Sequence, residues 1–343
     1  MKRFGILCAT FASFALIFPA GAADSATKPY PIVKVYSDGD AFWDHGTFDE
    51  GAKRLFLGRE NGITTIDAAT GKLTERLLSG KQVHKIVLLS GGRAIATEGG
   101  SADAIVFKRD TGEIIMRIPT GKKPDAATLD PVTNTVVIMD GISQDAVFVD
   151  ATTLKVLGRL QFDGEPETPV PDGKGHVFSP IADKSKINLI DVKSRTILKT
   201  YPLSDCADAS GLDLDPATGV LLVACANMKA LTLKADTGEV LGSTAIDKYP
   251  DGIVFDPARH VFYVPCFIPG TLDVLAEGKN GAPERKLAMP IAPGVHTEGL
   301  DAEGGKLYLP AGKIILPKKG GRPGVVHGTF KIFVVDVGAS SSP

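Results

Sequence analysis

Short apolar runs separated by turn residues fill the chain from residue 30 to residue 337. Runs such as AIVFKRD (104–110) and INLIDVK (187–193) alternate or cluster β-branched and aromatic residues, which is typical of β-strands. Between the runs lie turns such as DAATG (67–71) and DPATG (215–219), where Asp caps the turn and Gly accepts a positive φ. No helical period of useful length interrupts this pattern, so the sequence predicts an all-β protein.

The apolar runs recur at a regular interval. PDAATLDPVTNTVVIM (124–139), ASGLDLDPATGVLLVA (209–224) and PDGIVFDPARHVFYV (250–264) share one order: a small or acidic residue, an apolar run, Asp-Pro, a turn and a second apolar run. Alignment on the second run gives seven units, and the positions that open them lie 40 to 45 residues apart. We name these positions the head residues: Asp44, His84, Asp125, Glu167, Ser210, Asp251 and His296.

Four short strands per unit at this period predict a seven-bladed β-propeller with four-stranded blades. The seventh unit ends with its third strand, TFKIFVVDV (329–337), whereas YPIVKVYS (30–37) is a strand without a unit. We expect the N-terminal strand to complete the last blade, which closes the ring and hides its edges. The propeller then spans residues 30–337. A two-domain β-sandwich is the alternative, but it does not account for the period.

Residues 1–23 have the pattern of a secretory signal peptide. Two basic residues precede an apolar run, and small residues follow it. We expect cleavage near Ala22 or Ala23, a linker over residues 24–29 and a C-terminal tail over residues 338–343. The mature protein is then periplasmic or secreted. A retained membrane helix is the alternative, but the apolar run is shorter than the ~20 residues that a spanning helix needs.

Three stretches combine a turn with a strand in a recognisable way: DAATGKL (67–73), DPATGVLLVACAN (215–227) and ADTGEVLGSTAI (235–246). They resemble the YVTN-repeat β-propellers, the YncE-like exported proteins, and the resemblance covers residues 30–337. It implies an exported propeller but no particular activity, because most members lack an assigned one. The YVTN tetrad itself is absent, and its nearest counterparts are FVDA (148–151) and LIDV (189–192).

Three cysteines follow the signal peptide, so an oxidising compartment would leave one disulfide and one free thiol. Cys206 lies four residues before the fifth head residue, and Cys225 ends the second strand of the same unit. Both therefore reach the same face, and we expect them to pair, in agreement with the paired cysteines of the resembled family. Cys266 is the sixth unit's equivalent of Cys225, so a bridge between Cys225 and Cys266 is the alternative.

The head residues begin the innermost strands of the blades, so a propeller brings all seven to one mouth of the channel. Closure places His296, Asp44 and His84 on three neighbouring blades, with His45 beside them. Two imidazoles and a carboxylate form a ligand set for zinc or another divalent transition metal. The sequence therefore suggests a metal site at His84, His296, Asp44 and His45.

The other head residues allow further uses of the mouth. Asp125, Glu167 and Asp251 form an acidic arc that could hold a hard cation such as calcium or orient a polyol. The seventh head residue is Ser210. The alternative is purely structural, since polar residues at the start of a strand commonly bond to nearby backbone amides.

A long connection between the second and third strands of the last unit points at the same mouth. It spans residues 310–328 and is much longer than its equivalents, which is unusual for a loop without a task. This basic flap could admit an anionic substrate or neutralise the acidic rim; a surface loop without a function is the alternative. Its basic residues are Lys313, Lys318, Lys319 and Arg322.

The function classes follow from these features. Without residues 1–23 the chain has 36 basic and 40 acidic residues, a formal charge of −4, which with few aromatics argues against nucleic-acid binding. We expect a monomeric propeller that binds a small ligand, a metal or a protein partner at the channel mouth, with a divalent metal as the suggested cofactor and no assigned reaction. One alternative is a metal-dependent hydrolase or lactonase with its site in the channel. Another is a protein-interaction scaffold.

Overall fold

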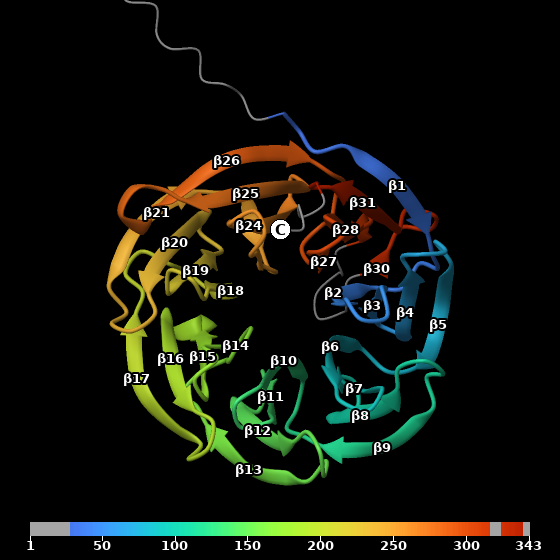
Figure 1. Cartoon of the computed structure of the whole chain (residues 1–343), viewed down its shortest axis with the longest axis horizontal. Coiled ribbons are helices and arrows are strands. Elements are labelled where there is room, and N and C mark those ends of the chain that lie inside the picture. The colour runs from blue at the N-terminus through green and yellow to red at the C-terminus, as the bar shows by residue number, and fades with distance from the viewer. Residues whose placement is uncertain (1–27, 316–323, 339–343) are drawn as a thin grey trace, which may run out of the picture.

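The computed structural model describes residues 28–315 and 324–338. These residues form seven antiparallel blades arranged radially around a central channel and one additional two-stranded ribbon, and the chain passes around the ring once (Figure 1). The seven-bladed propeller with four-stranded blades predicted from the repeat is confirmed. The predicted signal peptide, most of the linker and most of the C-terminal tail lie outside the described residues.

The first three blades each contain four strands in sequence order from the channel outward. The first blade contains β2 (Trp43–Asp49), β3 (Arg54–Arg59), β4 (Gly62–Asp67) and β5 (Leu73–Ser79). The second contains β6 (Val83–Leu89), β7 (Arg93–Glu98), β8 (Asp103–Lys108) and β9 (Ile114–Pro119). The third contains β10 (Pro124–Asp130), β11 (Thr135–Asp140), β12 (Asp145–Asp150) and β13 (Val156–Gln161).

The next three blades repeat this order, except that the inner strand of the sixth is interrupted. The fourth contains β14 (Val170–Pro171), β15 (His176–Ile181), β16 (Lys186–Asp191) and β17 (Thr196–Pro202), with a 3-10 turn η1 (Ala182–Lys184). The fifth contains β18 (Ala209–Asp215), β19 (Val220–Cys225), β20 (Lys229–Lys234) and β21 (Val240–Ala245). The sixth contains β22 (Lys248–Pro250), β23 (Val254–Asp256), β24 (Val261–Ile268), β25 (Thr271–Glu277) and β26 (Pro283–Pro290), with the 3-10 turn η2 (Lys279–Gly281).

The last blade is built from both ends of the chain. Its inner three strands are β27 (Gly299–Asp301), β28 (Lys306–Ala311) and β31 (Lys331–Asp336), and its outer strand is β1 (Ile32–Ser37). β1 pairs antiparallel with β31, which confirms the predicted closure by the N-terminal strand (Figure 1). A two-stranded ribbon, β29 (Ile314–Ile315) and β30 (Gly324–Val325), lies between β28 and β31 in the sequence.

The core of the described residues is divided among seven apolar clusters, one between each pair of adjacent blades. The middle strands supply most of it: every residue of β11 and of β19 is buried, while the outer strands β9 and β13 are mostly exposed. The cluster that joins the last blade to the first contains Trp43, Leu57, Tyr308 and Phe330. Ring closure therefore buries apolar surface as the other blade contacts do, and such burial is the main driving force for folding.

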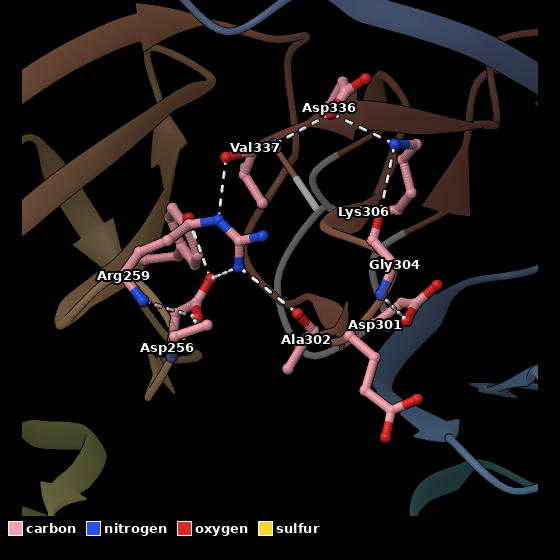
Figure 2. A network of polar contacts seen from close by, with 12 residues as sticks. Asp256, Arg259, Asp301, Ala302, Gly304, Lys306, Asp336 and Val337 are labelled. Carbon is pink, nitrogen blue, oxygen red and sulfur yellow. Dashed lines mark hydrogen bonds and ion pairs between the residues drawn. The ribbon is translucent and has the colours of Figure 1, made fainter. Parts of the chain in front are cut away.

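Polar contacts reinforce the junction between the sixth and seventh blades. Figure 2 shows Arg259 donating hydrogen bonds from Nε to the Val337 carbonyl at 2.9 Å and from Nη1 to Asp256 at 2.5 Å. Beyond it, Lys306 Nζ lies 3.1 Å from Asp336 Oδ1, on the strand that β1 covers. The network therefore fixes the C-terminal part of the ring.

The cysteines behave as the unit spacing predicts. Cys206 and Cys225 form a disulfide in the fifth blade, with their Cα atoms 5.2 Å apart. Cys266 is buried as a free thiol, so the alternative bridge is wrong. Within the described ranges no helix is long and apolar enough to cross a lipid bilayer.

Candidate functional site

The head residues converge on one end of the channel. Thr297, next to His296, donates a hydrogen bond to the backbone carbonyl of Asp44 at 2.8 Å, so the last and first blades meet there. Ser210 donates to the Pro250 carbonyl at 3.1 Å, beside Asp251. These contacts join neighbouring positions of the predicted ring, while the complete ring and its use as a binding site stay predictions.

Several head residues lie in β-bulges, where the regular pairing of the inner strand with its neighbour is interrupted. In β2 the register moves from Trp43 opposite Arg59 to Gly46 opposite Leu57, so Asp44 and His45 lie in a bulge. A bulge bends its strand and redirects side chains. Register shifts at equivalent places in β6, β10 and β18 contain His84, Asp125 and Ser210.

Asp44 is the hub of the mouth. One carboxylate oxygen lies 2.5 Å from His84 Nδ1, and the other lies 3.5 Å from His45 Nε2. His84 Nδ1 also lies 3.2 Å from Asp125 Oδ1. Carboxylate oxygens can only accept hydrogen bonds, so the short contact between Asp44 and His84 requires a proton on His84 Nδ1, unless a bound cation takes the place of that proton.

The charges around Asp44 shift its pKa and that of His84. Burial alone would raise the pKa of Asp44, but the imidazoles of His45, His84 and His296 lower it below the ordinary value. Burial disfavours the charged His84 ring, yet Asp125 and Asp44 raise its pKa to about 9. At neutral pH His84 therefore carries its second proton and links two carboxylates.

His296 is held in a fixed orientation. Only 6% of it is exposed, and the rings of Phe42, Trp43 and Phe267 lie 5.9, 5.6 and 5.7 Å from its own. Its Nδ1 bonds to the Gly294 carbonyl at 2.8 Å. A carbonyl can only accept, so Nδ1 carries a proton, and in the neutral ring Nε2 then has a free lone pair.

Asp251 completes a ligand set with these two residues. Ligand atoms of Asp44, Asp251 and His296 all lie within 4.8 Å of one another, and we name this set the metal triad. Burial raises the pKa of Asp251, His296 opposes the shift and Asp44 adds to it. Among residues 28–315 and 324–338, no hydrogen bond or ion pair to its carboxylate occurs, and His296 acts on it only through its charge. A cation would supply the missing partner.

A second set of ligand atoms, from Asp44, His84 and Asp125, also lies within 4.8 Å. Its carboxylates already have partners, because Lys123 Nζ lies 3.1 Å from Asp125 Oδ2 and His84 lies between the two acids. Glu167 stands nearby, and burial followed by the charges of Asp125 and Asp251 raises its pKa well above the ordinary value. The two carboxylates and the imidazole of this second set are therefore already paired with one another or with Lys123.

His45 differs from its predicted place. It belongs to neither set of ligand atoms and lines the interior of the channel instead. Burial lowers its pKa and Asp44 opposes the shift, so the ring is disposed to stay neutral. Although the two residues are adjacent in sequence, Asp44 belongs to both sets of ligand atoms while His45 lines the channel interior.

The base of the flap reaches the mouth. Lys313 accepts a hydrogen bond at its carbonyl from the Val326 amide at 2.8 Å. His327 Nδ1 lies 2.7 Å from Asp40 Oδ2, and a Cβ on Gly294 would lie 2.2 Å from the Gly312 carbonyl oxygen. The ribbon thus starts beside the backbone that holds His296. Three of the basic residues predicted for the flap, Lys318, Lys319 and Arg322, lie outside the described residues.

The structure adds three charged residues that the repeat did not indicate. Lys85, Asp213 and Glu298 line a cavity of about 460 Å³ inside the channel. They follow their head residues by one, three and two positions, so aligning the units does not collect them. A charged residue in or next to an inner strand was the available signal.

Comparison with known proteins supports the fold. No protein-family model matches this chain, and no curated protein sequence does. A chain in the crystal structure of the Mitotic Checkpoint Complex is similar with a TM-score of 0.73 and 11% identity, over 96% of this chain and 99% of that one. The crystal structure of the RRP9 WD40 repeats is similar with a TM-score of 0.72 and 8% identity, over 90% of this chain and 99% of that one.

A chain of the hydrazine synthase of Kuenenia stuttgartiensis has a TM-score of 0.68 and 13% identity, over 79% of this chain and 93% of that one. At such identities the likeness shows the fold alone. The chain therefore has the β-propeller fold, and its resemblance to the YVTN-repeat family stays a prediction.

Proposed function

We propose that this chain is an exported β-propeller of the YVTN-repeat kind that binds a divalent transition-metal ion at the mouth of its channel. Asp44, Asp251 and His296 would hold the ion. Two carboxylates and one imidazole neutralise a dication and belong to the donors that zinc and its neighbours accept. The proposal assigns no reaction to the site.

One observation carries the proposal. The Asp251 carboxylate is partly buried and lacks a hydrogen-bond or ion-pair partner in the described part of the chain, yet ligand atoms of Asp44 and His296 lie within 4.8 Å. Buried charges in proteins are normally paired or coordinate a metal. In addition, the bond from His296 Nδ1 to a carbonyl leaves Nε2 as the nitrogen that can bind a metal when the ring is neutral.

Export rests on two features. Residues 1–23 have the order of a signal peptide, and Cys206 and Cys225 form a disulfide, which persists in oxidising compartments. Mass spectrometry of the protein recovered outside the cytoplasm would find an N-terminus next to Ala22 or Ala23. A full-length chain retained in the cytoplasm would contradict export.

The metal proposal is tested by calorimetric titration of chelator-treated protein with Zn²⁺. We expect one ion per chain, and we expect Asp251→Asn and His296→Gln each to weaken binding by at least ~10-fold, because each removes a ligand. The substitution Asp251→Asn keeps the shape of the side chain, so it separates loss of a ligand from loss of packing.

The matched control is His176→Gln. His176 lies 2.8 Å from Asp172 and 3.8 Å from Asp191, at the start of β15, so it is also a histidine between two aspartates. Its substitution should leave the zinc affinity of the protein as it was. Equal zinc binding by wild type and Asp251→Asn, or loss of binding in the control alone, would overturn the proposal.

A further inference from the structure

The channel interior contains a cavity that the metal triad does not use. It measures about 460 Å³ and is lined by residues from the inner strands of all seven blades. This volume lies in the range of small-molecule sites, which are mostly apolar with a few converging polar groups. Ile253 and Val170 give it apolar walls.

Glu298 is the first group in this cavity without a partner. Only 6% of the residue is exposed, and its Oε2 atom is buried without a hydrogen-bond partner among the described residues. The carboxyl occupies space that Gly252 leaves free, since a Cβ there would lie 2.4 Å from Oε2. A buried carboxyl oxygen without a donor costs free energy in the unliganded protein, so its retention points to a donor from outside.

Lys85 is the second such group. It lines the cavity from β6, and its ammonium makes no hydrogen bond or ion pair in the part of the chain that the structure describes. Burial lowers its pKa, while the charges of Glu298 and Asp213 oppose the shift. An ammonium in this position is suited to an anionic group of a ligand.

Asp213 sets the charge balance but is already bonded. Its Oδ2 accepts from the Phe255 amide at 2.7 Å and its Oδ1 from the Leu214 amide at 2.8 Å. Burial raises its pKa to about 6, and the backbone bonds and Lys85 oppose the shift. The cavity therefore offers one unpaired cation and one unpaired acid. A dianion would be repelled by the acids, and a plain cation would leave Lys85 unpaired.

The geometry points to a second binding site in the channel cavity, for a small zwitterion of the amino-acid type, whose carboxylate pairs with Lys85 and whose ammonium pairs with Glu298. The ligand satisfies both unpaired groups at once and adds no net charge to a buried site. Its side chain would lie against the apolar walls. None of these contacts involves the metal triad, so the inference goes beyond the proposed function.

The test uses the mature protein in the presence of a chelator, so that its outcome does not depend on a metal. The probes are free L-amino acids from glycine to phenylalanine, each with its amide and its N-acetyl derivative. We expect at least one free amino acid to bind in calorimetry and to raise the melting temperature. Its amide, which lacks the carboxylate, and its N-acetyl form, which lacks the ammonium, should bind at least ~10-fold more weakly.

Two substitutions identify the groups. Lys85→Met should weaken binding of the free amino acid at least ~10-fold, and the variant should no longer bind the free amino acid more tightly than its amide. Glu298→Gln should no longer bind the free amino acid more tightly than its N-acetyl form. Lys108→Met is the control, because Lys108 is an exposed lysine paired with Glu113 at 2.7 Å. It should bind the amino acid as the wild type does.

The stability of the two variants separates a binding role from a structural one. If Lys85 and Glu298 serve a ligand, the empty Lys85→Met and Glu298→Gln proteins are at least as stable as wild type, because Lys85→Met removes an unpaired buried ammonium and Glu298→Gln removes a buried charge. Destabilisation of both, together with unchanged amino-acid binding, would overturn the inference. So would the absence of binding by every amino acid up to about 10 mM, or binding of acetate alone.

Discussion

The guanidinium of Arg59 in the first blade lies over the ring of Phe330 in the last blade, with Cζ 3.8 Å from the ring centroid. Arg59 is 2% exposed and forms an ion pair with Asp38, whose side chain is equally buried. It also donates to the Ala41 carbonyl at 2.9 Å. One side chain thus ties the linker after β1 to both blades that meet where the ring closes.

This arrangement predicts a large effect of Arg59→Met. Breaking a buried ion pair leaves the carboxylate of Asp38 without compensation, so the free energy of unfolding should fall by about 3 to 5 kcal/mol. Urea denaturation measures this change. The added substitution Asp38→Asn should restore part of the loss, because it removes the uncompensated charge.

Lys53→Met serves as the comparison. Lys53 pairs with Glu50 and Glu303 at the surface, and its side chain is 39% exposed. Its loss should lower stability by less than about 1 kcal/mol. Equal losses for the two variants would show that Arg59 contributes no more to closure than a surface ion pair does.

The environment of Asp140 predicts that the stability of the protein depends on pH. It ends β11 opposite Asp145, and burial raises its pKa to about 7; the Gly121 amide at 2.7 Å opposes this shift and Asp145 adds to it. A carboxyl with a higher pKa in the folded state stabilises the fold fully below its unfolded pKa of about 4, and that stabilisation is lost as the pH rises through 7.

Asp140→Asn should therefore flatten the stability profile between about pH 4 and pH 7, by on the order of 2 to 4 kcal/mol relative to wild type. Urea denaturation at several pH values gives this difference. Asp150→Asn is the control, because the Thr153 amide lowers the pKa of that exposed carboxyl. Its contribution to stability should therefore change with pH in the direction opposite to that of Asp140. Parallel profiles for wild type and Asp140→Asn would refute the assignment.

The disulfide predicts both a stability difference and a thiol count. Cys206 and Cys225 close a loop of 19 residues in sequence, so reduction should lower the free energy of unfolding by about 3 kcal/mol. Burial and the charge of Asp273 raise the pKa of the Cys266 thiol, which should not react with a thiol reagent in the native protein.

Unfolding the mature protein without reductant should expose one reactive thiol, and reduction should give three. Cys266→Ala tests the assignment, because it should remove the single thiol and leave the effect of reductant on stability intact. A reactive thiol in the native protein, or none after unfolding, would contradict the assigned pairing.

Much of the fold follows from the sequence because the period and the turn chemistry depend on local residues. The head residues opened each unit, and the missing fourth strand of the last unit indicated that residues 30–37 close the ring. The ligand geometry at the mouth could not be read in the same way. Register shifts in β2 and β6 alter the strands around Asp44 and His84. Asp251 lies between β22 and β23, where the inner strand of the sixth blade is interrupted, and joins Asp44 and His296 there.

The charged residues of the channel escaped prediction for a related reason. Lys85, Asp213 and Glu298 follow their head residues at three different offsets, and only the radial arrangement of the blades brings them to one cavity. A repeat alignment compares residues at equivalent positions of the units. The lining of the channel, in contrast, consists of residues that lie at the same depth along the channel axis. Because of bulges and strand breaks, residues at equivalent positions of two units can lie at different depths in the channel.

The metal triad is tested most directly by anomalous diffraction at the zinc absorption edge from crystals of the chelator-treated protein soaked in Zn²⁺. The account predicts one strong peak at the channel mouth, about 2.0 to 2.2 Å from oxygen atoms of Asp44 and Asp251 and from Nε2 of His296. It also predicts that this peak is lost in crystals of Asp251→Asn treated in the same way. A peak that persists in Asp251→Asn, or density at the mouth without an anomalous signal in the wild type, would contradict it.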